Sequence, residues 1–238
     1  MGIFINTLPI HNLMPFHAIK FNYNYKLPSI KMRLQDFSSF RTNQVSWFYN
    51  NNKMELRQVF SPVNQRIFEE LVFCLLTANT SAVMGIKGVD AVRDVMMTAT
   101  LEELQDRLKG AGYRYPNKRP EYIIEARAKN IDFESVLETF DDPKELREYF
   151  ASEVKGLGYK EASHFLRNIG VFGLAILDKH ILRTLHEYGM IDSVPKSLNK
   201  RNYLEIEQKF IEFSNQLNIN MDELDILLWS MKNGNIMK

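Results

Sequence analysis

The stretch Val154–Asp178 limits the possible folds of this chain most strongly, because it alternates glycine turns with helix starts. It opens with V-K-G-L-G-Y-K, in which two glycines permit a tight backbone turn. The pattern after the turn predicts a helix over Lys160–Asn168 that ends at Gly170. Another helix, over residues 142–153, comes before the turn. The sequence therefore predicts two helices joined by a hairpin at residues 154–160.

Lys160 and Asp178 are the candidate catalytic residues of this stretch. Lys160 stands at a helix N-terminus, where the positive end of the helix dipole disfavours an ammonium ion. Partial burial would add to this effect and leave a free amine, which is a nucleophile. Asp178 opens the next helix and is the expected partner of Lys160. Each also has an ordinary alternative: Lys160 as a solvated lysine, and Asp178 as an N-cap that contributes about 1 kcal/mol.

The two glycines of the hairpin, Gly156 and Gly158, form a candidate phosphate-binding turn. A tight turn brings backbone N–H groups close to a ligand, and the helix start after it adds donors and a positive dipole. Both features suit a DNA phosphate. A G-x-G pattern alone is also found in ordinary helix–helix turns, so both interpretations stay open.

Helical periodicity dominates the rest of the chain after Ser61. Apolar residues from Phe68 to Leu76 follow the i, i+3, i+4, i+7 spacing of a buried helix face. Thr100, with Glu103 three residues later, matches a capping box. No strand is predicted after residue 45, so the predicted fold class is all-α. Further helices are expected over residues 88–98, 179–188, 203–215 and 220–233.

Residues 1–31 have a different character. The segment F-N-Y-N-Y-K-L-P is rich in Asn and Tyr, shows no helical period, and lies in a region interrupted by prolines. We expect residues 1–31 to be an N-terminal extension that is disordered, or that precedes a native start at a downstream methionine such as Met32. The compact domain is then expected to cover residues 32–238.

Net charge gives no basic signature, since it is +1 with a sequence pI near 7.8. DNA binding therefore requires a local patch or backbone donors. One stretch, Arg107–Lys129, carries seven Lys/Arg against two Glu and includes three tyrosines. Basic residues interleaved with aromatic ones suit a nucleic-acid surface, but a solvated face between helices is an equally good interpretation.

The cysteine and histidine residues limit which disulfides and metal sites the chain can form. The single cysteine, Cys74, excludes an internal disulfide, a cysteine-based zinc site and a four-cysteine iron–sulfur cluster, and it indicates an intracellular protein. His164, His180 and His186 have no metal-ligand spacing, so no metal site is expected. No stretch approaches the roughly 20 apolar residues of a membrane span.

These features together resemble the helix–hairpin–helix, glycine-proline-aspartate superfamily of DNA base-excision glycosylases. V-K-G-L-G-Y-K-E-A-S-H-F-L is similar to the hairpin of that family, whose catalytic lysine falls on Lys160. The catalytic aspartate of the family falls on Asp178. L-L-T-A-N-T-S-A is similar to the segment that enters the DNA duplex, and it puts Asn79 at the position of the inserting glutamine. The resemblance implies two helical subdomains that flank a cleft.

Within the superfamily, residues 60–238 look most like the archaeal type-2 8-oxoguanine DNA glycosylases. The likeness includes G-Y-R-Y-P-N-K-R-P-E-Y-I-I-E-A-R, Trp229 in the final helix and the terminal Lys238. In that family the terminal lysine helps to distinguish 8-oxoguanine from guanine, which implies base recognition by Lys238 and Trp229. On pattern alone, Trp229 is equally a core residue, Lys238 a frayed terminus and Asn79 a helix cap.

The resemblance implies a bifunctional glycosylase and AP lyase. The damaged base flips out of the duplex, and the neutral amine of Lys160 attacks the sugar C1′. A Schiff base follows, and β-elimination cleaves the strand. Asp178 would stabilise positive charge and assist proton transfer. The expected partner is double-stranded DNA containing 8-oxoguanine, bound by a cytoplasmic monomer that needs no cofactor.

Two other hypotheses remain compatible with the sequence. The first is a glycosylase for another damaged base, such as an oxidised pyrimidine or an alkylated purine. The second is a helix–hairpin–helix DNA-binding module without catalysis. The role of Lys160 distinguishes an enzyme from a DNA-binding module, because only an enzyme needs the Lys160 amine as a nucleophile.

Overall fold

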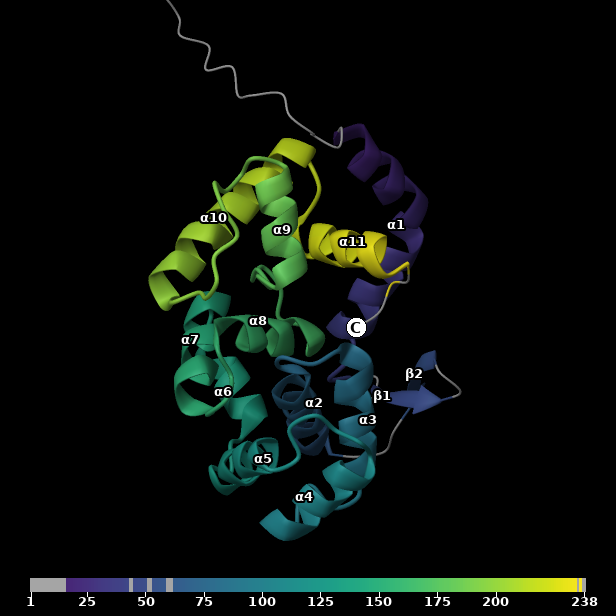
Figure 1. The fold of residues 1–238 in the computed structure, drawn as a ribbon, viewed down its shortest axis with the longest axis vertical. Coiled ribbons are helices and arrows are strands. Elements are labelled where there is room, and N and C mark those ends of the chain that lie inside the picture. The colour runs from purple at the N-terminus through teal and green to yellow at the C-terminus, as the bar shows by residue number, and fades with distance from the viewer. Residues whose placement is uncertain (1–15, 43–44, 51–52, 59–61, 235, 237–238) are drawn as a thin grey trace, which may run out of the picture.

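The structure, a computed structural model, describes residues 16–42, 45–50, 53–58, 62–234 and 236. These residues form eleven helices and one two-stranded hairpin (Figure 1). In chain order the elements are α1 Phe16–Ser38, β1 Val45–Asn50, β2 Lys53–Gln58, α2 Val63–Thr77, α3 Ala82–Val92, α4 Leu101–Gly110, α5 Lys118–Ala128, α6 Phe133–Thr139, α7 Pro143–Glu153, α8 Tyr159–Asn168, α9 Lys179–Glu187, α10 Lys200–Leu217 and α11 Met221–Asn233.

Helix α2 lies at the centre of the lower group of helices. Ten of its fifteen residues are buried, because apolar side chains surround almost its whole circumference. It packs against α3, α5, α6 and α8. Above α8, the helices α9, α10 and α11 form a second group (Figure 1). The prediction of an all-α fold with two helical groups is confirmed.

Local capping signals identified several helix ends correctly. Thr100 accepts a hydrogen bond from the Glu103 amide and starts α4, and Asp142 accepts one from the Lys144 amide and starts α7. The limits predicted for the helix over residues 88–98 are wrong. Ser81 caps the Met84 amide instead, so the helix starts and ends earlier, as α3.

The expectation of disorder for residues 1–31 is wrong for residues 16–31, which belong to α1; residues 1–15 lie outside the described part of the chain. Pro28 lies inside α1, where it removes one backbone hydrogen bond. Tertiary packing offsets that loss, because Ile19, Ile30 and Phe37 are almost fully buried. The sequence pattern missed the helix since its buried residues are few and widely spaced.

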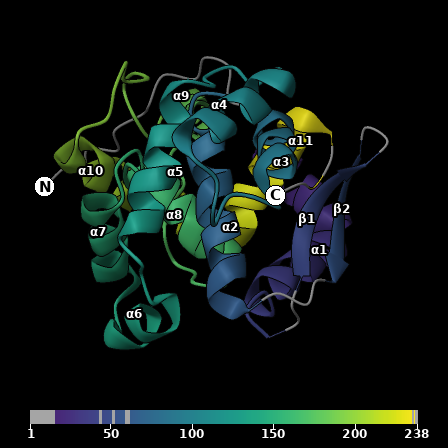
Figure 2. The same cartoon turned by 90° about the horizontal axis from the view of Figure 1, so that it is seen from below.

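The hairpin β1–β2 is the second departure from prediction. Its strands pair antiparallel, with Trp47 opposite Leu56. Trp47 is 4% exposed, and the guanidinium of Arg33 from α1 lies 4.2 Å from its ring centroid. Figure 2 shows the hairpin beside α1 and α3, on the side of the molecule opposite α6 and α7. Packing against these helices stabilises two short strands that alone would be marginal.

Gly170 provides a test of how closely α1 approaches the turn after α8. Its φ of +88° is in the left-handed region, and an added Cβ would lie 2.7 Å from the Phe37 carbonyl oxygen. Gly170→Ala is expected to reduce the free energy of unfolding by about 2 to 4 kcal/mol through backbone strain and overlap.

Chemical denaturation measures this change. The matched control is Gly110→Ala at the end of α4, where nothing lies within 4 Å of an added Cβ. That variant is expected to be neutral or slightly more stable, because alanine is the better helix former. Equal stability of the Gly170 and Gly110 variants would contradict the close approach.

Candidate active site

The predicted hairpin joins α7 to α8 and depends on its first glycine. Gly156 has φ +92°, and an added Cβ would lie 2.5 Å from the ring of Tyr122. Both the backbone conformation and the close approach therefore require glycine. Gly158 is extended, with φ −85°, and is the N-cap residue of α8. The hairpin thus leads directly into the helix whose second residue is Lys160.

A cleft of about 970 Å³ lies where the two helical groups meet. Five residues singled out from the sequence line it: Asn79, Gly158, Lys160, Asp178 and Trp229. Gly156, the other glycine of the hairpin, is not among the residues that line the cleft. Lys238 lies outside the described residues, so its role in base recognition stays a prediction.

Lys160 is 29% exposed in this cleft, and its Nζ lies 3.0 Å from Oε1 of Glu161. The described ion pair of Lys160 is therefore with its neighbour in the first turn of α8, and not with Asp178, the expected partner. The tertiary structure does bring Lys160 and Asp178 to the same cleft. A half-buried amine on a helix N-terminus can approach an electrophile bound between the two helical groups.

Asp178 is the N-cap of α9, which was the ordinary role expected for it. Its Oδ1 accepts hydrogen bonds of 2.8 Å from the amides of both His180 and Ile181. The described capping bonds use this one oxygen, so the cap orients the carboxylate without occupying its other oxygen. A fixed carboxylate on the cleft wall can stabilise positive charge that develops nearby.

The connection that leads to Asp178 is held by buried side chains of α10. Tyr203 donates to the Ala175 carbonyl at 2.6 Å, and the Ala175 amide donates to Glu207 at 3.0 Å. Glu207 also forms a buried ion pair with Arg147 of α7. These contacts fix an irregular segment that has no helix or strand of its own, and so they fix the position of Asp178.

Asp225 is a cleft residue that the sequence interpretation missed. It lines the cleft from α11, one turn before Trp229, and it forms a buried ion pair with Arg167 of α8. Burial raises the pKa of Asp225 to about 7; Arg167 opposes the rise, and Asp178 and Asp222 add to it. The i, i+4 spacing from Trp229 was the available signal, since such residues share a helix face.

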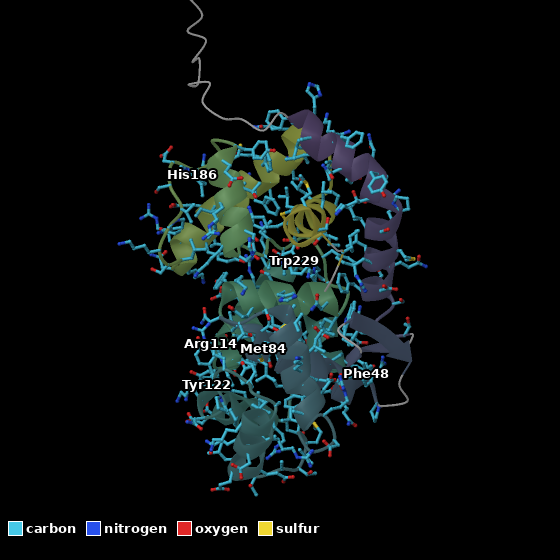
Figure 3. All side chains as sticks on the ribbon, turned by 45° about the vertical axis from the view of Figure 1, so that its right-hand side comes forward. Phe48, Met84, Arg114, Tyr122, His186 and Trp229 are labelled. Atoms are coloured by element: carbon cyan, nitrogen blue, oxygen red, sulfur yellow. The ribbon has the colours of Figure 1, made fainter. Side chains whose placement is uncertain are left out.

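Trp229 is half-buried on the wall of the cleft, rather than fully buried in the core. In Figure 3 it lies on the underside of α11, above Met84 of α3 and above Arg114, which belongs to the connection between α4 and α5. Asn79 follows the end of α2 with a left-handed φ of +61°. It therefore has the conformation of a helix C-terminal cap and also lines the cleft, and its insertion into the duplex stays a prediction.

The basic stretch Arg107–Lys129 fits each of its two interpretations, a nucleic-acid surface and a face between helices, only in part. Most of its cations bind acidic side chains or helix-end carbonyls of this chain: Arg107 pairs with Asp94, Arg119 donates to Ala78, and Arg127 donates to Met96 and Ala99. Arg114 and Tyr115 line the cleft. The stretch is therefore mainly structural, with one cation and one aromatic ring at the cleft.

The described residues contain no group of three or more His, Cys, Asp or Glu side chains that could hold a metal ion. None of their helices is long and apolar enough to span a bilayer.

Comparisons with known proteins agree on one family. A family model described as Ogg-HhH, 8-oxoguanine DNA glycosylase, matches residues 49–219. The 8-oxoguanine DNA glycosylase/AP lyase of Methanocaldococcus jannaschii is 38% identical over 208 residues, which cover 87% of this chain and 100% of the relative. Its namesake from Korarchaeum cryptofilum is 46% identical over 175 residues, with 74% and 84% covered.

Solved structures give the same result. The crystal structure of the M. jannaschii glycosylase/lyase in complex with 15mer DNA containing 8-oxoguanine has a TM-score of 0.81 at 36% identity, and covers 95% of this chain and 100% of that one. The 8-oxoguanine DNA glycosylase of Thermotoga maritima has a TM-score of 0.80 at 32% identity, with 96% and 100% covered.

The raised pKa of Asp225 predicts how the free energy of unfolding changes with pH. Its carboxyl ionises near 3.8 in the unfolded chain and near 7 in the folded protein. Between these values the unfolded state loses a proton that the folded state keeps. The stabilising contribution of Asp225 is therefore full below pH 4 and declines by about 1.4 kcal/mol for each unit up to pH 7.

Denaturation of the wild-type protein and Asp225→Asn between pH 4 and 8 measures this decline. The difference in unfolding free energy, wild type minus variant, is expected to fall up to pH 7 and then level off. Glu205→Gln, which removes an exposed carboxylate from α10, is the control and is expected to give a flat difference. A flat difference for Asp225→Asn as well would refute the raised pKa.

Proposed function

The chain belongs to the 8-oxoguanine DNA glycosylase family, and we propose that Lys160 and Asp178 carry out the chemistry of that family here. The protein is a DNA repair enzyme that excises 8-oxoguanine and cleaves the strand 3′ to the abasic site through a lysine Schiff base. The observation that supports the residue assignment is the shared cleft, in which Lys160 on α8 and Asp178 on α9 face the same space.

In the first step the neutral amine of Lys160 attacks C1′ of the flipped nucleotide. The bond from C1′ to the base breaks, and the base leaves with the bonding electrons and takes up a proton. Asp178 stabilises the positive charge that develops on the sugar and then on the substituted amine. Its cap on α9 holds the carboxylate in place before the substrate arrives, so no reorganisation is needed during the step.

In the second step the sugar ring opens as the nitrogen of Lys160 forms a double bond to C1′. Loss of a proton from C2′ then expels the 3′ phosphate oxygen, which is the β-elimination. Water hydrolyses the Schiff base and returns the amine. A carboxylate on the cleft wall is suited to move the protons of these steps, and Asp178 is our candidate.

The DNA backbone is proposed to bind at the hairpin. The α8 N-terminus offers amides and a positive dipole end beside Gly158, which suits a phosphate. Arg114 adds a cation to the lining of the cleft. Asn79, in its exposed left-handed turn, is our candidate for insertion into the duplex. This local arrangement accounts for DNA binding by a chain of nearly zero net charge.

The base pocket is proposed to lie against α11. Trp229 presents an aromatic ring to the cleft, which is suited to stack on a flipped purine. Lys238, the other residue predicted for base recognition, keeps that role as a proposal. We also propose that the enzyme acts as a monomer, since one chain supplies both walls of the cleft, and that it acts in the cytoplasm, where its substrate DNA lies.

Borohydride trapping tests Lys160 directly. Reduction of the Schiff base should link wild-type protein covalently to DNA that contains 8-oxoguanine, and Lys160→Ala should abolish the adduct. Lys129→Ala is the matched control, since it removes an exposed lysine outside the hairpin and the cleft, whose partner is Glu153. Trapping by Lys160→Ala, or none by the wild type, would exclude Lys160 as the nucleophile. Duplexes with other damaged bases test the lesion.

Asp178→Asn separates catalysis from capping. Asparagine caps a helix about as well as aspartate, so the free energy of unfolding is expected to change by less than about 0.5 kcal/mol. Loss of the charge is expected to slow excision by about 10²- to 10³-fold. Single-turnover kinetics and denaturation measure the two effects, with Asp178→Ala as the variant that loses both. Normal excision by Asp178→Asn would leave Asp178 only its structural role.

A further inference from the structure

Helix α1, which the sequence pattern did not predict, packs along α11 (Figure 1). Ile19 and Ile30 of α1 are fully buried in the common core. Figure 1 shows α1 on the outer side of the molecule, with α11 between it and the other helices. One element therefore covers the back of the helix whose other side carries Trp229 and Asp225.

Two polar side chains of α1 bind α11. The Tyr23 hydroxyl donates to Oε2 of Glu223 at 2.6 Å, at the start of α11. The Lys26 amine lies 3.3 Å from the Ser230 carbonyl oxygen and 3.2 Å from Ser230 Oγ. Glu223 and Ser230 are seven residues apart, about 10 Å along the helix axis. Tyr23 and Lys26 thus hold α11 near both of its ends.

Burial and charge stabilise both the Tyr23–Glu223 and the Lys26–Ser230 contacts. Burial raises the pKa of Tyr23 to about 12, and the hydrogen bond to Glu223 contributes further. Ser230 is fully buried, and its carbonyl also accepts a hydrogen bond from the Gly234 amide at 2.9 Å, so Lys26 uses the second lone pair of that oxygen. A cation at a helix C-terminus also interacts favourably with the helix dipole.

A third contact links α1 to Asp225 by another route. The guanidinium of Arg167 lies 5.1 Å from the ring centroid of Phe37 in α1, and the same guanidinium pairs with Asp225. Arg167 also lies against Asn168, which donates to Glu70 of α2 at 2.7 Å. The cleft face of α11 is therefore supported from α1 at its back and from α8 at its side.

We propose that Tyr23 and Lys26 are positioning residues for recognition of the damaged base, which act by fixing α11 and with it Trp229 and Asp225. The inference rests on the proposed function, because it takes α11 as the wall of the base pocket. An error of about 1 Å in the placement of a binding group can cost about a hundredfold in rate. Lys160 and Asp178 belong to α8 and α9, which these two contacts do not hold.

Loss of the Tyr23 and Lys26 contacts should therefore affect base excision and cleavage at an abasic site differently. Excision of 8-oxoguanine needs the base in its pocket. Cleavage of a preformed abasic site needs Lys160 but no base, because the base is already absent. Loosening α11 should reduce the first activity and spare the second, whereas general destabilisation would reduce both.

The test compares wild type with the double variant Tyr23→Phe/Lys26→Met, which removes the hydroxyl and the amine and keeps the apolar parts. Single-turnover excision from an 8-oxoguanine duplex is expected to slow by about tenfold. Borohydride trapping on preformed abasic DNA should stay within about twofold of wild type. Tyr25→Phe/Lys31→Met makes the same changes at exposed positions of α1 and should match wild type in both assays.

Single variants keep the test decisive if the double variant folds poorly. Tyr23→Phe alone should show the same separation to a smaller extent, and Lys26→Arg, which keeps a cation, should retain more excision than Lys26→Met. Equal losses of excision and trapping, or unchanged excision, would overturn the positioning role. Failure of the wild-type protein to trap abasic DNA would instead overturn the proposed function of Lys160.

Discussion

The buried ion pair between Arg147 and Glu207 is the interaction on which the geometry of the site depends. It joins α7, which leads into the hairpin, to α10 in the other helical group. The Arg147 guanidinium also lies 4.9 Å from the ring centroid of Tyr159, the residue before Lys160. Glu207 binds the Ala175 amide, three residues before Asp178. This one ion pair thus fixes the positions of both cleft walls relative to each other. Breaking such a pair leaves an unpaired buried charge, which costs about 3 to 5 kcal/mol.

Electrostatics in this protein are local. The net charge of +1 offers no long-range attraction to DNA, and most cations of the basic stretch bind groups of the protein itself. What the cleft offers a phosphate is a helix N-terminus beside Gly158 and the cations that line it, among them Arg114, Lys179 and Lys196. Its acidic side chains have different environments: Asp178 caps a helix, while burial raises the pKa of Asp225 to about 7.

The parts of the chain beyond the family match complete the site. The match covers residues 49–219, and α1 and α11 lie outside it. Yet α11 supplies Trp229 and Asp225 to the cleft, and α1 supports α11 from behind. In our proposal the hairpin–aspartate core carries the reaction, and α11, supported by α1, forms the wall of the pocket for the base.

The sequence by itself determined the features that arise within a few residues of chain. Glycines at the hairpin, Thr100 and Asp142 as caps, and the 3.6-residue period of α2 each act locally, so the pattern alone predicted them. The family resemblance then placed Lys160 and Asp178. Only the tertiary structure decided what depends on residues far apart in sequence. Packing holds α1 helical despite Pro28, supports the hairpin β1–β2, brings Lys160 and Asp178 to one cleft, and buries Asp225 beside Arg167. The physical reason is range: caps and turns are satisfied by neighbours in sequence, whereas burial and ion pairing are set by whichever distant residues the completed fold brings together.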